Sequence, residues 1–340
     1  MSLGELKGVM AGAGFFARFH ADAWNRTAGA RIAAVADLDL ARARAFAAEW
    51  AIPAVYADVS AMLAREKPDF LDIVTGPAAH RPLTELAASE KVTVISQKPM
   101  APTMEDCLAM TEACERAGVR LLIHENWRWQ PWYRESKRID LSGALGRVFH
   151  LAFRMRTGDG RGAEPYPVQP YFRGMRRLLI YETLVHFLDT FRFLGGEIRS
   201  LYCQAARVNP VIAGEDCALI QLNFAGGAHG LIDANRISGP LPAEPAFGAF
   251  RMEGDSAMLR MTGDGRLFLT PYGEPEREHV YDIPQCGYKG DSIVALHTHF
   301  VDCLRNNRLC ESEAREYLAT VRAVFAAYES AETNRPIRLS

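Results

Sequence analysis

Short apolar runs alternate with longer amphipathic stretches over the first 125 residues. The apolar runs, which predict β-strands, are residues 6–11, 31–36, 70–75, 92–96 and 120–124. Between them apolar side chains recur with helical spacing, which predicts helices over residues 16–27, 40–50, 59–67, 81–90 and 104–117. This alternation predicts βαβ units with a parallel sheet, and near-continuous apolar strands suit a sheet that is covered on both faces.

The pattern changes after residue 125. Strand-like runs now follow one another, separated by glycine-rich turns, at residues 148–155, 200–208, 218–224, 229–235, 247–253, 257–262 and 266–269. Helices are predicted over residues 179–194, 291–306 and 312–334. Consecutive short strands indicate a mostly antiparallel sheet. We therefore predict an α/β nucleotide-binding domain over residues 1–125 and an α+β domain over residues 126–340.

Composition narrows the class of protein. The chain has 340 residues, 49% hydrophobic and 24% charged, which is typical of a globular protein with ample material for a core. A formal net charge of −2 gives no electrostatic reason to expect nucleic acid or a membrane as partner. Seven cysteines without a CxxC pair favour a reducing compartment. With no signal-peptide pattern and no apolar run of about 18 residues, we expect a cytoplasmic protein.

A glycine turn follows the first predicted strand. Gly12, Gly14 and Ala17 have the G-x-G-x-x-G/A spacing and open a predicted helix, whose N-terminus favours phosphate. Asp37 ends the second strand, where a carboxylate binds the ribose hydroxyls of a dinucleotide. An acid there repels a 2′-phosphate and Leu38 supplies no balancing cation, so NAD is favoured over NADP. The alternative is a strand–helix turn that binds no ligand.

Two further strand ends carry polar residues. The turn Thr75-Gly76-Pro77 and the nearby His80 lie at the end of the strand predicted over residues 70–75, and Lys98 lies at the end of the strand predicted over residues 92–96. Ligands of open α/β sheets bind at these carboxyl ends. The alternative to a ligand-binding role is a packing role for His80 and a solvent-exposed position for Lys98. Lysine can exchange a proton with a hydroxyl group when it is desolvated. Pro99 makes the Lys98–Pro99 bond a candidate cis peptide.

The helix predicted over residues 179–194 bears polar residues on one face. Glu182, His186 and Asp189 fall at i, i+4 and i+7 of an otherwise apolar segment. Buried polar groups are costly unless they are used, and histidine titrates in the range that suits a general acid or base. Two alternatives stay open, a divalent-metal site and the polar seam of a domain interface. The sequence supplies no clear further ligand set, and we predict no metal.

These motifs, in this order, resemble those of the glucose–fructose oxidoreductase/inositol dehydrogenase/rhizopine-catabolism (Gfo/Idh/MocA) family. The resemblance covers the whole chain. It rests on "GAGFFA", "TGPAAH", "QKP", "NWRWQP" and "ETLVHFLD". It implies a Rossmann domain, a second domain with an open antiparallel sheet, and a homo-dimer or homo-tetramer.

The resemblance also implies an NAD(P)-dependent oxidoreductase that acts on a secondary alcohol of a sugar, inositol or related polyol. Lys98 would polarise the hydroxyl, His186 would act as general acid/base, and Glu182 would assist in catalysis. The cofactor would contact Gly12, Ala13, Gly14, Phe15, Phe16, Asp37, Thr75, Gly76, Pro77, His80, Gln97, Lys98 and Asn126. The substrate would contact Lys98, Trp127, Arg128, Tyr171, Arg173, Glu182 and His186.

Two positions depart from the family pattern. Gln97 replaces a glutamate before the lysine, and Glu182 replaces an aspartate before the histidine. Glutamine still hydrogen-bonds a ribose hydroxyl but brings no negative charge beside Lys98. Two other functions use the same residues: an NAD-dependent hydrolase or lyase that works through transient oxidation, and a non-catalytic NAD-binding sensor.

Overall fold

The computed structural model describes residues 4–339, which form two compact units. The first unit comprises residues up to Asn126 together with Cys286–Ala319. The second comprises Trp127–Gln285 and the segment from Thr320 onward. The sequence-based division assigned residues 126–340 to one domain, whereas the structure groups residues 286–319 with the first unit.

A six-stranded parallel sheet forms the centre of the first unit, in the order β3-β2-β1-β4-β5-β6. Its strands are β1 (Leu6–Ala11), β2 (Ala30–Ala36), β3 (Ala54–Tyr56), β4 (Phe70–Ile73), β5 (Thr93–Gln97) and β6 (Leu121–His124). The intervening helices are α1 (Ala17–Arg26), α2 (Leu40–Trp50), α3 (Val59–Glu66), the 3₁₀ turn η1 (Pro77–Ala79), α4 (His80–Ser89) and α5 (Met104–Ala117). This arrangement confirms the predicted Rossmann-type fold.

The strands of this sheet are apolar because the sheet is buried. Every residue of β4 and β6 is buried, as expected for strands that are covered on both faces. The sequence pattern missed only the three-residue strand β3 in this sheet, since so short a run shows no period.

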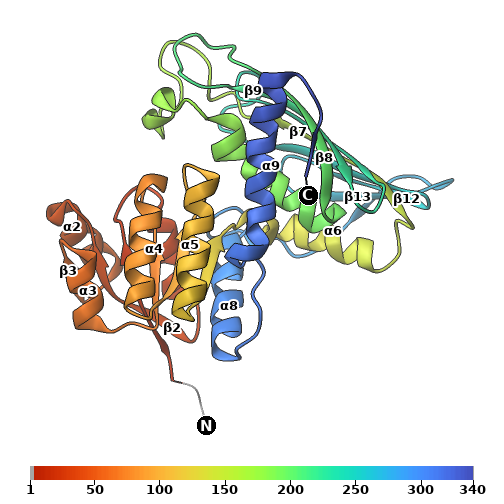
Figure 1. Cartoon of the computed structure of the whole chain (residues 1–340). Helices are drawn as coiled ribbons and strands as arrows, with labels where there is room; N and C mark the ends of the chain where they lie inside the picture. The colour runs from red at the N-terminus through yellow and green to blue at the C-terminus, as the bar shows by residue number, and fades with distance from the viewer. Residues whose placement is uncertain (1–3, 340) are drawn as a thin grey trace. The chain divides into compact units, whose positions relative to one another are not determined.

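The segment that returns to the first unit contains the helix α8 (Ser292–Arg305) and the start of α9 (Ala314–Thr333). Figure 1 shows α8, in blue, among the red-to-yellow elements of this unit. Arg26 at the end of α1 makes a bidentate ion pair with Asp291, the residue before α8, at 2.7 Å for both contacts. Tyr288 packs its ring against Phe16 and Phe19 at the start of α1, with centroid distances of 5.3 and 4.8 Å. The segment is therefore joined to α1 at both ends of that helix.

A nine-stranded sheet dominates the second unit, in the order β14-β13-β12-β11-β7-β10-β9-β8-β15. Neighbouring strands run antiparallel except the parallel pair β7 and β10, which agrees with the predicted mostly antiparallel sheet. The strands are β7 (Val148–Arg156), β8 (Ile198–Ala206), β9 (Cys217–Phe224), β10 (His229–Asn235), β11 (Gly248–Gly254), β12 (Ala257–Met261), β13 (Leu267–Pro271), β14 (Arg277–His279) and β15 (Ile337–Arg338). Strand β9 alternates buried and more exposed residues, so one face of the sheet is packed.

Helices pack on this sheet, and α9 runs along it in Figure 1. The others in this unit are the 3₁₀ turns η2 (Trp127–Trp129) and η3 (Pro170–Gly174), α6 (Pro131–Leu141), the π-helical turn η4 (Leu179–Leu184) and α7 (Val185–Gly195). On α7, Phe187 stacks on Phe153 of β7 with ring centroids 4.2 Å apart. The helix predicted over residues 179–194 is present, but its first six residues are π-helical rather than α-helical. Among the described residues, no helix combines the length and apolar character needed to cross a bilayer.

Candidate functional site

The glycine turn after β1 has the shape that a dinucleotide needs. Gly12 has a φ of +102°, and a Cβ there would lie 2.5 Å from the carbonyl oxygen of Val74, so only glycine fits. A Cβ on Gly14 would meet nothing within 4 Å, which leaves open space above the backbone at the start of α1. The first glycine makes the tight turn and the second leaves room for a pyrophosphate at a helix N-terminus. The turn fits the predicted cofactor.

Asp37 lies beside this turn. Its Oδ2 accepts a hydrogen bond from the backbone N–H of Ala13 at 2.8 Å, and its Oδ1 accepts one from Asp39 N–H at 2.9 Å. Each carboxylate oxygen keeps capacity for a further donor, such as a ribose hydroxyl. Sequence reasoning missed a cation here, since Arg42 in the first turn of α2 places Nη2 3.5 Å from Asp37 Oδ1. Arg42 is half exposed, and it supplies the positive charge that Leu38 does not.

The carboxyl ends of β1, β4 and β5 lie in a row, because these strands are neighbours in the sheet. The Thr75-Gly76-Pro77 turn follows β4, with Gly76 exposed. His80 is fully buried, and its two ring nitrogens lie 3.0 Å from the Met100 carbonyl oxygen and 3.1 Å from that of Thr75. Burial lowers the pKa of His80. The imidazole thus lies between the turns that follow β4 and β5.

Gln97 and Lys98 lie at the end of β5. The Lys98–Pro99 peptide bond is cis, as the sequence suggested. The Gln97 side chain is buried, and its Oε1 accepts a hydrogen bond from the Lys98 backbone N–H at 2.7 Å. Its Nε2 faces the Nε2 atom of His20 at 2.9 Å. The glutamine is therefore fixed at both ends of its amide.

The predicted contact Asn126 lies at the end of the first unit, and its amide Nδ2 donates to the Ser292 hydroxyl at 2.9 Å. Phe15, on the glycine turn, is partly exposed with the Arg18 guanidinium 4.3 Å from its ring centroid. Asn126 thus packs inward, while Phe15 faces solvent.

In the second unit, His186 occupies the first turn of α7, directly after the π-helical turn. Its ring stacks on the buried Trp127, with centroids 4.6 Å apart and an interplanar angle of 21°. Glu182, in the π turn, accepts a hydrogen bond from the Thr183 hydroxyl at 2.8 Å. Its Oε2 also lies 4.0 Å from Nη1 of Arg236. π-Helical turns are rare and often mark functional sites.

The other predicted substrate contacts have defined partners within this unit. Arg128 is buried and makes two 2.7 Å hydrogen bonds to the Asp189 carboxylate, which also accepts from Thr320. Arg173 donates to the carbonyl of Pro165 at 2.8 Å and pairs with Glu164. Tyr171 is exposed, and its hydroxyl accepts from Gln169. Asp189, which the sequence grouped with Glu182 and His186, thus anchors Arg128.

Two buried charges near the helix start were missed from sequence. The Glu215 carboxylate accepts hydrogen bonds from the backbone N–H groups of Leu178 and Ile180, at 3.2 and 2.9 Å, and so caps the π turn. Arg236 pairs with Asp159 and donates to the Thr183 hydroxyl at 3.1 Å. Both residues lie in loops or at strand ends far from residue 182 in sequence, where local periodicity gives no signal.

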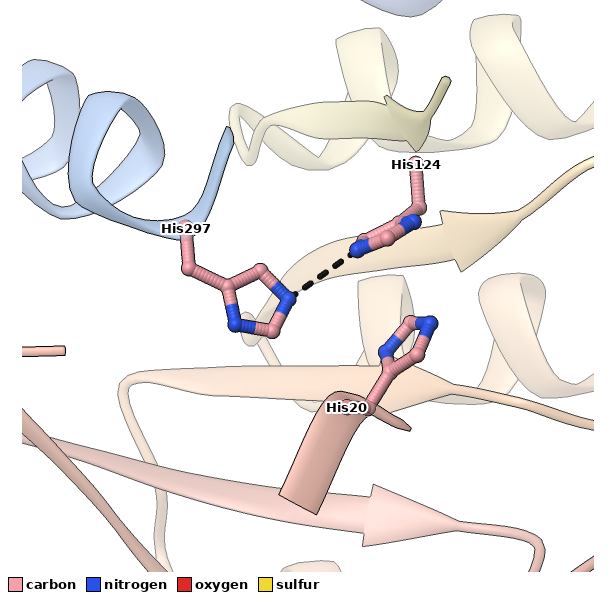
Figure 2. A group of neighbouring side chains, drawn as sticks. All are labelled: His20, His124 and His297. Carbon is pink, nitrogen blue, oxygen red and sulfur yellow. Dashed lines mark hydrogen bonds between the residues drawn. The ribbon is translucent and has the colours of Figure 1, made fainter. Parts of the chain in front are cut away.

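Three buried histidines of the first unit lie close enough together to raise the question of a metal (Figure 2). His124 and His297 are joined by a hydrogen bond between their Nε2 atoms at 3.0 Å. The rings of His20 and His124 are stacked 3.9 Å apart at 29°, so their in-plane lone pairs do not converge on one point. Both nitrogens of His20 are also engaged, by Asp72 and Gln97. This geometry favours a hydrogen-bonded aromatic cluster over a metal centre.

Comparison with protein families places both units in one group. A family described as "Oxidoreductase family, NAD-binding Rossmann fold" matches residues 6–125, and one described as "GFO/IDH/MocA C-terminal domain" matches residues 133–254. The chain is 36% identical over 344 residues to a D-apiose dehydrogenase of Paraburkholderia graminis, covering 98% of this chain and 90% of that protein. It is 34% identical over 345 residues to a D-apiose dehydrogenase of Rhizobium rhizogenes, covering 99% and 98%.

Among solved structures, the chain is similar to an oxidoreductase from Agrobacterium radiobacter, solved in complex with NAD⁺, L-tartaric acid and magnesium. The TM-score is 0.91 with 33% sequence identity, and the match covers 98% of each chain. The glycine turn with Asp37 and the two family matches agree with one another. This chain belongs to the Gfo/Idh/MocA family of oxidoreductases.

Proposed function

We propose that this protein is an NAD-dependent dehydrogenase that oxidises a secondary alcohol of a sugar or related polyol. The observation that carries the proposal is the row of strand ends at β1, β4 and β5, where the glycine turn, the Thr75 turn and Lys98 follow neighbouring strands. Ligands of open parallel sheets bind at such an edge. Names of the relatives support the substrate class, since two full-length relatives are called D-apiose dehydrogenases.

In this proposal the first unit binds the dinucleotide. Backbone N–H groups at the start of α1 bind the pyrophosphate across Gly14, and Asp37 binds the adenosine ribose. Bound nicotinamide supplies the hydride acceptor, which no side chain can replace. Asp37 favours NAD, because its charge repels a 2′-phosphate. Arg42 works against that preference, because its positive charge attracts a 2′-phosphate.

Two side chains of the protein bind and transfer the proton of the reacting hydroxyl group. Lys98 binds the reacting hydroxyl and polarises its O–H bond, and His186 accepts the proton in oxidation and returns it in reduction. Trp127 holds the His186 ring by stacking. Glu182 contributes a carboxylate to the substrate region of the second unit. The full-length relatives named dehydrogenases favour this activity over a hydrolase with transient oxidation and over a sensor.

The test is a cofactor-coupled assay. Purified protein is incubated with NAD or NADP and a panel that includes D-apiose, D-xylose, inositols and sugar acids, and reduced nicotinamide is followed by absorbance. Lys98→Ala and His186→Ala should each retain NAD binding and lose activity. Wild-type protein that reduces neither cofactor on the panel, or a Lys98→Ala variant with full activity, would refute the proposal.

We also propose that the protein works in the cytoplasm as a homo-dimer or homo-tetramer, with the large sheet of the second unit as the subunit contact. Seven cysteines, none in a disulfide among the described residues, support a reducing compartment. Sedimentation of the purified protein tests the assembly, and a monomer would refute it.

A further inference from the structure

A continuous chain of hydrogen bonds crosses the interior of the first unit and ends at Lys98. It begins at the fully buried Asp72 of β4, whose Oδ2 lies 2.8 Å from His20 Nδ1 and accepts a second hydrogen bond from Trp24 Nε1, also at 2.8 Å. His20 Nε2 then lies 2.9 Å from Gln97 Nε2, and Gln97 Oε1 accepts from the Lys98 N–H at 2.7 Å. Three elements, α1, β4 and β5, contribute one member each before the chain reaches Lys98.

The hydrogen-bond pattern fixes the direction of every donor along this chain. The Lys98 N–H can only donate, so the oxygen of the Gln97 amide must face it and the NH₂ group must face His20. His20 Nε2 therefore presents a lone pair, and its proton lies on Nδ1, which donates to the Asp72 carboxylate. The reverse orientation of the amide would set two donors against each other at Lys98. Neutral His20 with its proton on Nδ1 is the state in which each of these hydrogen bonds joins one donor to one acceptor.

The surroundings hold the His20 ring in this orientation. His124 of β6 stacks on it, and His297 of α8 lies at 5.5 Å, ring edge toward ring face (Figure 2). His297 in turn stacks on Trp24 with ring centroids 3.7 Å apart, and Trp24 returns to Asp72. The titratable groups that face His20 are thus Asp72, His124 and His297. Asp72 and Gln97 hold the two nitrogens of the ring, His124 stacks on it, and His297 and Phe16 make edge-to-face contacts with it, so the ring has little freedom to turn.

We propose that Asp72, His20 and Gln97 are positioning residues, which fix the position of the Lys98 backbone N–H. The amide at position 97 is required so that Nε2 of His20 carries no proton and the ring is neutral. The inference rests on the role of Lys98 in the proposed function. Glutamine meets this need, because its amide donates to His20 and accepts from Lys98. A carboxylate at 97 would face a lone pair of His20, so it would need a second proton on that ring.

Two substitutions at position 97 test the chain. Gln97→Met keeps the volume and removes both hydrogen bonds, so the Lys98 turn loses its support. We expect kcat to fall about 10- to 100-fold, because small misplacements of a reacting group cost this much. KM for the sugar should stay within about three-fold of wild type. Ser96→Ala, a neighbouring buried change on β5 whose hydroxyl makes only a 3.5 Å contact, is the matched control and should leave kcat unchanged.

Gln97→Glu keeps an acceptor for the Lys98 N–H, but its second oxygen then faces the Nε2 lone pair of His20. A second proton on His20 would turn that contact into a hydrogen bond. His20 would then carry protons on both nitrogens, between the carboxylates of Asp72 and Glu at 97. We expect activity relative to wild type to be retained at low pH and to fall as pH rises and that second proton is lost. A role in folding alone would not create a new pH dependence of this ratio.

The protonation of His20 is measured without turnover, by ¹⁵N NMR of protein labelled at histidine. Wild type should show a proton on Nδ1 and none on Nε2, and Gln97→Glu should show both. In a second sample, labelled at lysine, the Lys98 backbone amide signal should shift in Gln97→Met. A proton on Nε2 in wild type, an unshifted Lys98 signal, or full kcat in Gln97→Met would overturn the inference. Wild type that oxidises no sugar while the NMR results hold would count against the proposed function instead.

Discussion

The preference for NAD depends on one carboxylate, and Asp37→Asn tests it. Asp37 already accepts one backbone N–H on each oxygen, from Ala13 and Asp39, and each oxygen has one further lone pair for a ribose hydroxyl. A hydrogen bond to a charged group contributes about 1.5–3 kcal/mol. Loss of one such bond should therefore weaken NAD binding about 10- to 140-fold, at 1.4 kcal/mol per factor of ten.

The same substitution should help NADP. It removes the negative charge that repels a 2′-phosphate, and it releases Arg42, whose Nη2 lies 3.5 Å from the carboxylate. NADP binding should therefore stay level or tighten while NAD binding weakens. Both Kd values are measured by the quenching of protein fluorescence at low salt, since surface charge effects are screened at high salt.

Asp58→Asn is the matched control, because Asp58, in the same unit, likewise accepts a hydrogen bond from a backbone N–H, that of Ala61 at 2.7 Å. Its loss should leave both cofactor affinities unchanged. An equal loss of NAD and NADP binding in Asp37→Asn would mean that the carboxylate only supports the glycine turn. Unchanged NAD binding would refute the ribose contact altogether.

Three further predictions concern stability. Burial lowers the pKa values of His297 and His80, so below about pH 6.5 the unfolded chain binds protons that the folded chain does not. The free energy of unfolding should therefore be highest above about pH 6.5 and fall as the pH drops below it. Urea midpoints measured between pH 8 and pH 5 should show this fall. Asp189→Leu should cost about 3–5 kcal/mol in urea unfolding, since it leaves Arg128 buried without its carboxylate, and adding Arg128→Met should restore most of the loss. Glu215→Gln should lower the thermal midpoint, because it weakens the cap on Leu178 and Ile180, whereas the exposed Glu115→Gln should not.

The fold was largely readable from local pattern. Strands β1 of the parallel sheet and β10 of the larger sheet were predicted to the residue, because apolar residues recur along each of them next to glycine-containing turns. The helix α6 was missed, since its start is crowded with tryptophan and arginine rather than marked by a regular apolar stripe. The return of residues 286–319 to the first unit was also missed. No local signal specifies which of two cores a late helix will join.

The sequence predicted the motifs of the candidate site, but it did not predict the contacts between their side chains. The glycine turn and Asp37 were found because their spacing is set by backbone geometry. Arg42 and Asp72 were overlooked for opposite reasons. The Arg42 side chain crosses the start of α2 to reach Asp37, and the sequence alone does not reveal this contact. Asp72 looked like one polar residue in an apolar strand, and only the fold shows that His20 and Trp24 share it.

The late helix α8 has a consequence for synthesis on the ribosome. Domains commonly fold as units while the chain emerges, the first one first. Here the first unit is completed by residues 286–319, so His297 and Tyr288 reach it only when nearly the whole chain has been made. Until then the surface of α1 that receives α8 stays uncovered, while strands β7 to β14 of the larger sheet are translated. We expect truncation after residue 126 to give a chain that aggregates rather than a minimal nucleotide-binding domain.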